Sequence, residues 1–267
     1  MAAAAPDGSS VRLDAGGVTD TGRRRPINED ELLLRPELGL FAICDGVGGR
    51  NSGDLASKLA TVSLANFFEA SREGDWPEKY GSLMDLTLPP AAQRLCAAVR
   101  KANLDVYDIA STREKHDKMS TTVVAAHHEP GAEVLHIVNV GDSRCYGIRK
   151  GKMVQLTKDH TLRNEARRQY PDITDERLAK VPKNVLTRAL GRKDDVEIDT
   201  RTVSVRPDDI FLLCSDGVTR EISDRRILEA VLVAETAQEA TELLIDLANE
   251  RGGRDNITAL ALRFTAG

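Results

Sequence analysis

The sequence lacks the usual signs of a membrane-spanning, secreted or zinc-binding protein. No apolar run approaches the roughly 18 residues that a transmembrane helix needs. Met1–Ser10 has no basic start followed by an apolar core, so it is not a secretory signal, and we expect a disordered tail there. Four cysteines occur far apart and form no Cys-x-x-Cys pair: Cys44, Cys96, Cys145 and Cys214. We expect them to be small buried hydrophobes, as in a reducing cytoplasm, rather than zinc ligands or disulfides.

The sequence also lacks an excess of positive charge. The formal net charge is -5, which argues against a general nucleic-acid binder. The arginine clusters at 23–25 and 167–168 are local exceptions, and we interpret them as solvated faces. The 267 residues contain no internal repeat or low-complexity tract. We therefore expect a cytoplasmic protein with one domain over residues 11–267, which binds neither nucleic acid nor membrane.

What the sequence does contain is a repeated pattern of an apolar strand followed by an aspartate beside a glycine. Asp45-Gly46 follows the apolar run that starts at Phe41, and Asp216-Gly217 follows the run that starts at Phe211. A third apolar run ends in Gly141-Asp142. A single Asp-Gly is usually only a turn, but the repetition predicts strand ends that meet in one pocket.

Further acidic residues precede two other strand patterns. Asp255 stands before the last strand, and the adjacent Glu29 and Asp30 stand before an early one. Carboxylates that crowd together repel one another and lose hydration, so such a cluster needs bound cations. Oxygen ligands without a grouping of histidines or cysteines favour Mg²⁺ or Mn²⁺ over Zn²⁺. The residues themselves therefore predict a carboxylate metal centre.

Hydrophobic periodicity predicts an α+β protein, because strands and helices come in blocks and the strand spacing favours antiparallel hairpins. We expect helices at Ser52–Ala70, Ala91–Ser111, Asp224–Ala234 and Thr236–Glu250. We expect strands at Val11–Thr19, Glu31–Leu34, Leu38–Cys44, Thr121–Ala126, Val134–Val140, Ser143–Arg149, Met153–Leu156, Asp199–Val205, Asp209–Cys214 and Ile257–Phe264. Residues 161–183 are polar and weakly patterned, which predicts a mobile flap with a short helix at Leu162–Gln169.

Six short motifs occur in one order along the chain. They are Gly22-x-x-Arg25-x-x-Asn28-Glu29-Asp30, Asp45-Gly46-Val47-Gly48-Gly49, Gly141-Asp142-Ser143-Arg144, Thr157-x-Asp159-His160, Ser215-Asp216-Gly217 and Asp255-Asn256. Together they make the chain resemble the bacterial branch of the metal-dependent protein phosphatases, the protein phosphatase 2C family, from about Leu13 to Phe264. Each motif alone is weak, whereas six in register are specific.

This resemblance implies a sandwich of two mainly antiparallel sheets flanked by pairs of helices, with a metal site at one end. It implies hydrolysis of phosphoserine and phosphothreonine in proteins by a water that two Mn²⁺ or Mg²⁺ ions activate, attacking phosphorus in line. A Ser/Thr kinase, or its substrates, would be the natural partner.

The resemblance also assigns the site residues. The first ion would be held by Asp45, Asp216 and Asp255. The second would be held by Asp45, the carbonyl of Gly46 and the pair Glu29 and Asp30, with one acid acting through water. A weaker third ion would lie between Asp142 and Asp216. Arg25 would hold the substrate phosphate through its planar guanidinium, and Asn256 would support the site.

The sequence departs from the family at two places. Some relatives carry a histidine after Asp-Gly as the proposed general acid, and here Val47 stands there, followed by Arg50 after the glycines, so no general acid is assigned. Ser120 replaces a glycine beside Thr121.

Two other functions remain open: an inactive binding module with this fold, and a phosphatase of a small phosphomonoester. Two residues also keep simpler interpretations. Asp142 alone would be a surface charge in a hairpin turn, and His160 would form a structural hydrogen bond within the Thr157–His160 turn. The histidines at 127, 128 and 136 would be structural or solvent-facing.

Overall fold

The computed structural model describes residues 11–48, 52–71, 85–112 and 119–267. The predicted tail at residues 1–10 lies outside these ranges, as do Gly49 and Arg50 of the glycine-rich motif. No helix in the described part of the chain is both long enough and apolar enough to cross a membrane.

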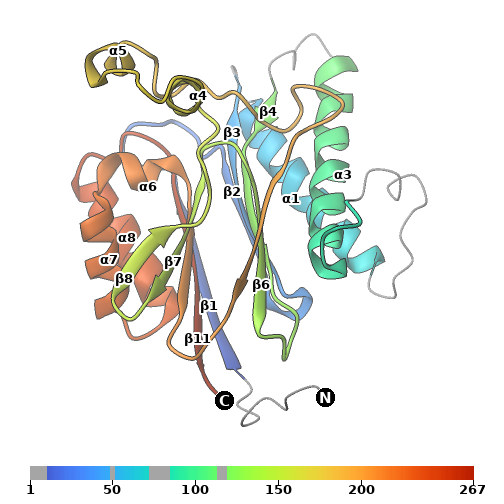
Figure 1. Cartoon of the computed structure of the whole chain (residues 1–267), viewed down its shortest axis with the longest axis vertical. Coiled ribbons are helices and arrows are strands. Elements are labelled where there is room, and N and C mark those ends of the chain that lie inside the picture. The colour runs from blue at the N-terminus through green and yellow to red at the C-terminus, as the bar shows by residue number, and fades with distance from the viewer. Residues whose placement is uncertain (1–10, 49–51, 72–84, 113–118) are drawn as a thin grey trace.

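Two antiparallel sheets face each other at the centre of the molecule (Figure 1). The first sheet has the order β1 (Val11–Asp20), β11 (Ile257–Ala266), β10 (Ile210–Cys214), β7 (Arg144–Arg149) and β8 (Lys152–Gln155). The second has the order β2 (Asp30–Arg35), β3 (Leu40–Val47), β5 (Val123–His127), β6 (Val134–Val140) and β9 (Asp199–Ser204), and the short β4 (Ser120–Thr121) pairs with the end of β3. This arrangement confirms the predicted sandwich.

Helices cover the outer face of each sheet (Figure 1). The first sheet carries α6 (Asp216–Glu221), α7 (Asp224–Val233) and α8 (Ala237–Glu250), and the second carries α1 (Gly53–Ala70) and α3 (Pro90–Thr112). The four long helices were predicted within a few residues. The structure adds α6, the short α5 (Asp175–Ala179) and a 3-10 turn at Pro36–Leu38, none of which the periodicity predicted.

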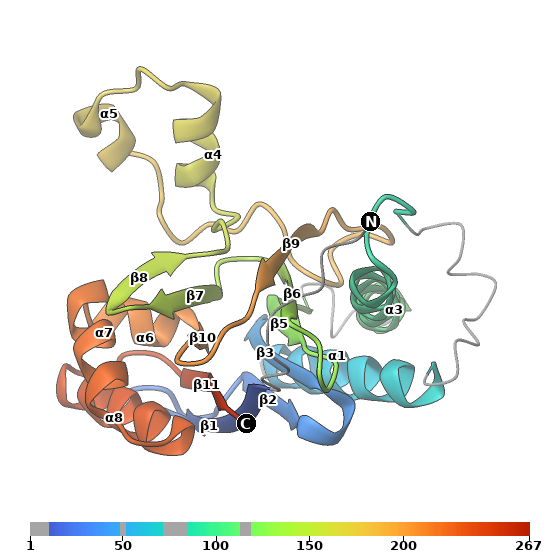
Figure 2. The same ribbon diagram turned by 60° about the horizontal axis from the view of Figure 1, so that its bottom comes forward.

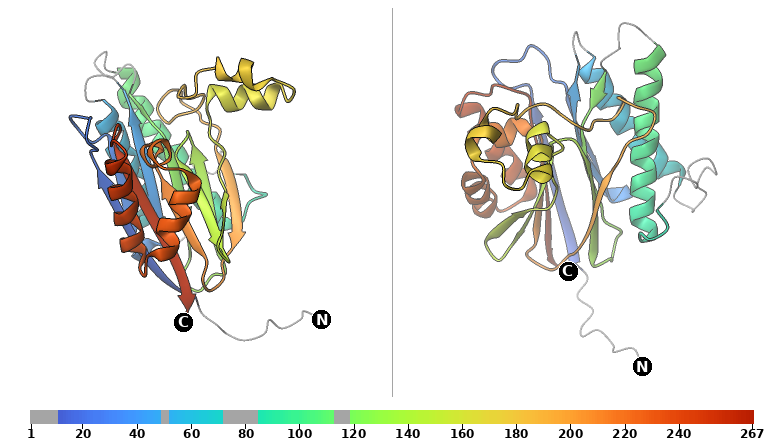
Figure 3. Two further views of the ribbon diagram at one scale, coloured as in Figure 1. Left: turned by 90° about the vertical axis from the view of Figure 1, so that its left-hand side faces the viewer. Right: turned by 45° about the horizontal axis from the view of Figure 1, so that its top comes forward.

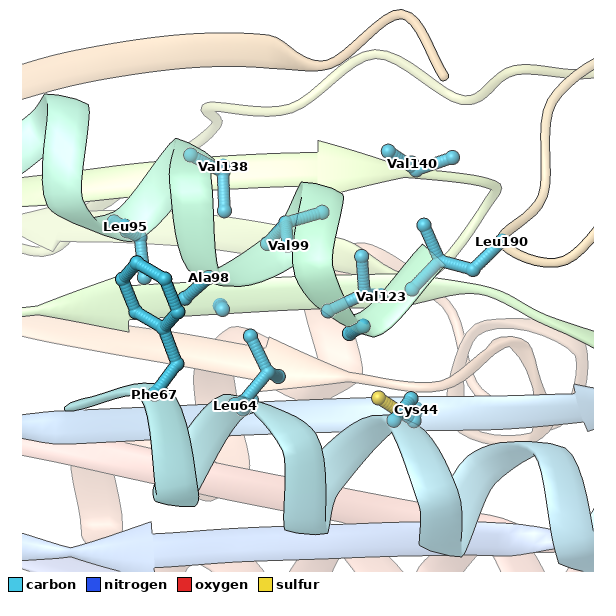
Figure 4. Close-up of a cluster of buried hydrophobic side chains, with 14 of the residues drawn as sticks. Cys44, Leu64, Phe67, Leu95, Ala98, Val99, Val123, Val138, Val140 and Leu190 are labelled. Atoms are coloured by element: carbon cyan, nitrogen blue, oxygen red, sulfur yellow. The ribbon is translucent and has the colours of Figure 1, made fainter. Parts of the chain in front are cut away.

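The sequence of β3 is apolar on both faces because both faces are covered. Phe41 and Ile43 are fully buried in the core between the two sheets. Ala42 and Cys44 point the other way, into the core that the second sheet forms with α1 and α3 (Figure 4). Since complete burial of a large apolar side chain is worth about 1.5–3 kcal/mol, both layers hold β3 in place, and with it the aspartate near its end.

The cysteines behave as the sequence predicted. All four are free and buried. Burial raises the pKa of the thiols of Cys44, Cys145 and Cys214, which keeps them protonated and unreactive.

The two Asp-Gly segments form different local structures. We predicted that the first strand ends at Cys44, but β3 continues to Val47 because Gly46 and Val47 pair with Thr121 and Ser120 of β4. On β10 the strand ends at Cys214 as predicted. The chain then turns directly into α6, which begins with the aspartate at position 216.

The predicted flap region projects away from the sandwich (Figures 2 and 3). Its helix α4 (Leu162–Gln169) has the predicted bounds and begins after Thr161, whose hydroxyl accepts a hydrogen bond from the N–H of Asn164. No residue of α4 is buried. Thr161 also forms an isolated bridge with Leu186, so the two ends of this segment lie side by side.

Candidate metal centre

One pocket of about 500 Å³ collects the predicted site residues at one end of the sandwich. It contains every predicted ligand or substrate-binding residue except Asp30. The lining residues are Arg25, Glu29, Asp45, Gly46, Val47, Gly48, Asp142, Asn184, Val185, Leu186, Arg192, Asp216, Arg220, Asp255 and Asn256. Segments that are far apart in the sequence therefore meet here, as the repeated pattern predicted.

Asn256 fixes the loop that carries the early site residues. Its side-chain N–H groups donate to the carbonyl of Thr21 at 2.9 Å and to that of Ile27 at 2.8 Å. Its side-chain oxygen accepts from the N–H of Glu29 at 2.9 Å. These three bonds tie the loop with Arg25 and Glu29 to the residue that follows Asp255, which is a supporting position of the kind we predicted.

Two glycines allow backbone segments to approach closely. A Cβ atom on Gly46 would lie 2.1 Å from the carbonyl oxygen of Gly53 and 2.6 Å from that of Glu29. A Cβ atom on Gly217 would lie 1.9 Å from the carbonyl oxygen of Asn256. The glycine after each key aspartate is therefore required by packing at the pocket rather than by a turn alone.

Asp30 lies outside the pocket. Its carboxylate is buried and accepts hydrogen bonds from the hydroxyl of Thr258, at 2.7 Å, and from Ser215. Burial is the main reason that its pKa rises to about 6. As the first residue of β2 it pairs with Asp45. Of the two adjacent acids, only Glu29 lines the pocket, and the assignment of Asp30 to the second ion stays a prediction.

On the side of the pocket that β3 forms, the pKa of the carboxylate is raised by negative neighbours. Burial raises the pKa of Asp45 well above its usual range, and repulsion from Asp30, Asp216 and Asp142 raises it further. Burial and Asp142 also raise the pKa of Asp216, but there the positive charge of Arg220 works in the opposite direction.

Arg220 is a site residue that the sequence analysis missed. Its guanidinium forms an ion pair with Asp216, and its Nη1 lies 3.0 Å from Oδ2 of Asp255. Arg25 reaches the same Asp255, with Nη2 at 2.9 Å from Oδ1. Arg220 follows Asp216 by four residues, which is the spacing of neighbours on a helix face. This spacing points to a contact only if residues 216–220 are helical, and the sequence analysis did not predict α6.

Within the described residues, no three histidine, cysteine or acidic side chains already form the ligand group of one ion. Arg220 contacts oxygens of both Asp216 and Asp255, and Arg25 contacts Asp255. The donor set nevertheless fits Mg²⁺ or Mn²⁺. It consists of oxygens, and the burial and mutual repulsion of Asp45 and its neighbours leave a deficit of positive charge that a cation would remove.

Asp142 belongs to the pocket and is not a surface charge of a hairpin turn. It lines the pocket and is only 9% exposed. His160 holds the turn beside it: its backbone N–H donates to the carbonyl of Gly141 at 2.8 Å, and its Nδ1 accepts from the N–H of Gly141 at 3.1 Å. His160 is therefore structural, but its bonds join it to Gly141 rather than to the Thr157–His160 turn, where we expected them.

The other three histidines in the described part of the chain are structural as well. Each uses Nδ1 in a hydrogen bond within the second sheet or the turns beside it. The partners are the carbonyls of Gly39 and Val134 for His127 and His128, and the hydroxyl of Thr202 for His136.

Among the described residues, the lining of the pocket includes no histidine, cysteine or serine. Val47 lines it at the position where some phosphatases of the resembled family carry a histidine. The described lining of the pocket therefore offers neither a cysteine or serine nucleophile nor a histidine that could act as a general acid.

Comparison with known proteins gives a consistent result. The sequence pattern of the protein phosphatase 2C family matches residues 23–252. The serine/threonine phosphatase stp of Listeria innocua is 33% identical over 91% of this chain and 92% of its own length. The serine/threonine protein phosphatase PstP of Mycobacterium tuberculosis is also 33% identical over 91% of this chain, which corresponds to 43% of the longer PstP.

Solved structures show the same likeness in three dimensions. The catalytic domain of PstP in complex with two manganese ions superposes with a TM-score of 0.78 at 31% identity, covering 96% of this chain and all of that domain. A structure of PstP from Mycobacterium tuberculosis gives a TM-score of 0.79 at 30% identity.

Proposed function

The chain belongs to the protein phosphatase 2C family, and we infer from this membership and from the carboxylate pocket that it is a metal-dependent protein-serine/threonine phosphatase. The observation that carries this inference is the meeting of Asp45, Asp142, Asp216 and Asp255 with Arg25 in one pocket. A binding module would not need four carboxylates whose proximity raises their own free energy.

We assign the ligands as follows. The first ion binds Asp45, Asp216 and Asp255. The second binds Asp45, the carbonyl oxygen of Gly46 and Glu29, while Asp30 supports it through water or through Asp45, its neighbour across the strand pair. Asp142 and Asp216 would hold a third, weaker ion. Mn²⁺ and Mg²⁺ both suit these oxygen ligands, and the relative with two manganese ions favours Mn²⁺.

When bound, the ions supply a strongly nucleophilic water and positive charge for the phosphoryl oxygens. The side chains that line the pocket would position the substrate. Arg25 lines the pocket with its side chain 46% exposed, so its guanidinium is accessible to a substrate phosphate. Asn184 and Val185, which directly follow the flap region, line the same pocket. There they would contact the substrate residues on either side of the phosphoamino acid.

The function is tested with p-nitrophenyl phosphate and a phosphothreonine peptide, each with added Mn²⁺ and then with EDTA. We expect hydrolysis of both, lost with EDTA and restored by Mn²⁺. Activity on the small ester alone would favour a small-molecule phosphatase. Activity on neither, with the fold confirmed by circular dichroism, would favour the inactive binding module.

The natural partner is a separate proposal. We propose phosphorylated proteins as substrates, with a Ser/Thr kinase or its targets among them. The cytoplasmic location remains a prediction from the sequence.

A further inference from the structure

Arg220 occupies the oxygens that the proposed ions require. It forms an ion pair with Asp216, and its Nη1 lies 3.0 Å from Oδ2 of Asp255. These two acids come from different elements, the start of α6 and the loop before β11. One guanidinium therefore joins two of the three carboxylates that we assign to the first ion.

The contact is strong enough to compete with a metal. The side chain of Arg220 is 34% exposed, and those of Asp216 and Asp255 are 11% and 20% exposed. Hydrogen bonds between charged groups at such partly buried positions are stronger than those between neutral groups. Each N–H group that a carboxylate oxygen accepts leaves one lone pair fewer for an ion, and the guanidinium repels a metal cation at this distance, so the two cations compete for these acids.

The structure also gives Arg220 a place to move to. A second cavity of about 290 Å³ lies beside the pocket, and both are lined by Arg220, Asp142 and Asp216. Asp159 and Thr219 belong to the lining of the second cavity. The charge of Arg220 already acts on Asp142, where it opposes the rise in pKa that burial causes. The second cavity is also lined by Arg144, Arg163 and Lys183, and Arg144 already pairs with Asp159 at 2.7 Å. After release from Asp216 and Asp255, the guanidinium would therefore keep Asp142 as its neighbouring carboxylate.

Arg25 differs from Arg220 in this respect. It contacts Asp255 alone, and its side chain is more exposed, at 46%. Arg25 leaves Asp216 free, whereas Arg220 bridges both acids. The bridging position identifies Arg220 as the principal competitor of the first ion.

We propose that Arg220 is an exchangeable internal cation: it holds Asp216 and Asp255 together in the metal-free protein, and metal ions must displace it. This inference rests on the ligands assigned under the proposed function. Two consequences follow. Arg220 stabilises the metal-free fold, and it weakens the affinity of the centre for metal by the free energy of the contacts that the ion has to break.

The test compares Arg220→Gln with wild type and with a matched control, Arg225→Gln. Gln keeps much of the side-chain length and removes the charge. Arg225 also forms a helical i,i+4 ion pair, with Glu229 at 2.9 Å, but it is 88% exposed and lies outside the pocket. Each protein is freed of metal with EDTA. Mn²⁺ binding is then measured by titration calorimetry, and thermal unfolding is followed with and without Mn²⁺.

We expect Arg220→Gln to bind Mn²⁺ about tenfold more tightly than wild type, a difference of about 1.4 kcal/mol. Its metal-free melting temperature should be lower, so that Mn²⁺ raises it by more than in wild type. Arg225→Gln should match wild type in both measurements. In ¹⁵N NMR spectra of wild type, the Nε–Hε signal of Arg220 should shift on addition of Mg²⁺.

Equal or weaker Mn²⁺ binding by Arg220→Gln would overturn the inference. If this variant does not fold without metal, Arg220→Lys keeps the charge but cannot bridge two carboxylates in the same way. Its affinity should then exceed that of wild type by a smaller factor, and an unchanged affinity would again overturn the inference. Absence of Mn²⁺ binding by wild type would instead overturn the proposed function.

Discussion

Asp45 and Asp216 enter the same pocket from opposite sheets, and the two sides of the pocket balance their charge differently. Asp45 lies on β3, and the charges that raise its pKa are those of other carboxylates. Asp216 begins α6, where Arg220 provides a positive charge from the next turn of the same helix. The second-sheet side therefore depends on an added cation, whereas the first-sheet side carries one of its own.

Because of this difference, binding of a metal ion would change the energy of the two aspartates in different ways. On the side of Asp45, an ion bound as proposed would relieve repulsion that the fold has to tolerate without metal. On the side of Asp216, it would replace an interaction that the fold already has. Substitutions of the two aspartates should therefore have the same effect on catalysis but effects of different size on the stability of the metal-free protein.

The largest expected effect is the loss of turnover. Asp45→Asn and Asp216→Asn should each lower kcat/KM for p-nitrophenyl phosphate by about a thousandfold or more, because each removes a ligand shared by two proposed ions. Steady-state assays at saturating Mn²⁺ measure this. Near-normal activity in either variant would contradict the ligand assignment.

A smaller effect distinguishes the two sides. Without metal, Asp45→Asn should melt at a higher temperature than wild type, because one of several repelling charges is gone. The melting temperature of Asp216→Asn should rise by less, because burial and repulsion also raise the pKa of Asp216 but Arg220 loses a partner, which offsets part of the gain. Calorimetry in EDTA checks both. An equal or larger rise for Asp216→Asn would show that the two sides are not compensated differently.

The smallest expected effect concerns Arg25. Arg25→Ala should raise KM for p-nitrophenyl phosphate about tenfold with little change in kcat, because binding present in both ground and transition states is lost. Arg24→Ala serves as the control, since Arg24 is exposed and does not line the pocket. An unchanged KM for Arg25→Ala would place the phosphate elsewhere.

Much of this centre was readable from the sequence because its aspartates follow strands with a clear apolar pattern. Phe41–Cys44 and Phe211–Cys214 fill cores on both faces, so their hydrophobicity alone identifies them as buried strands. Strand ends that carry aspartates at one end of a sandwich bring those aspartates together. The prediction of the pocket needed little more than this.

The parts that were missed depend on contacts between distant segments. The extension of β3 to Val47 requires pairing with β4, more than 70 residues later in the chain, and short polar segments such as β4 have no strand pattern of their own. Glu29 and Asp30 differ because β2 begins at Asp30: strand pairing with Asp45 holds Asp30, whereas Glu29 belongs to the preceding loop, which Asn256 holds. Their adjacency in the sequence gave no sign of that boundary.

The bridge between Thr161 and Leu186 has a consequence for how this protein could diversify. A segment whose two ends are already paired is a closed loop, and doubling the length of such a loop costs only about 0.6 kcal/mol of chain entropy. Residues 162–185 could therefore be lengthened, shortened or exchanged as a cassette without moving the strands that carry the aspartates. The fold therefore separates the strands that carry the aspartates, which must keep their positions, from residues 162–185, whose sequence can change with the substrate.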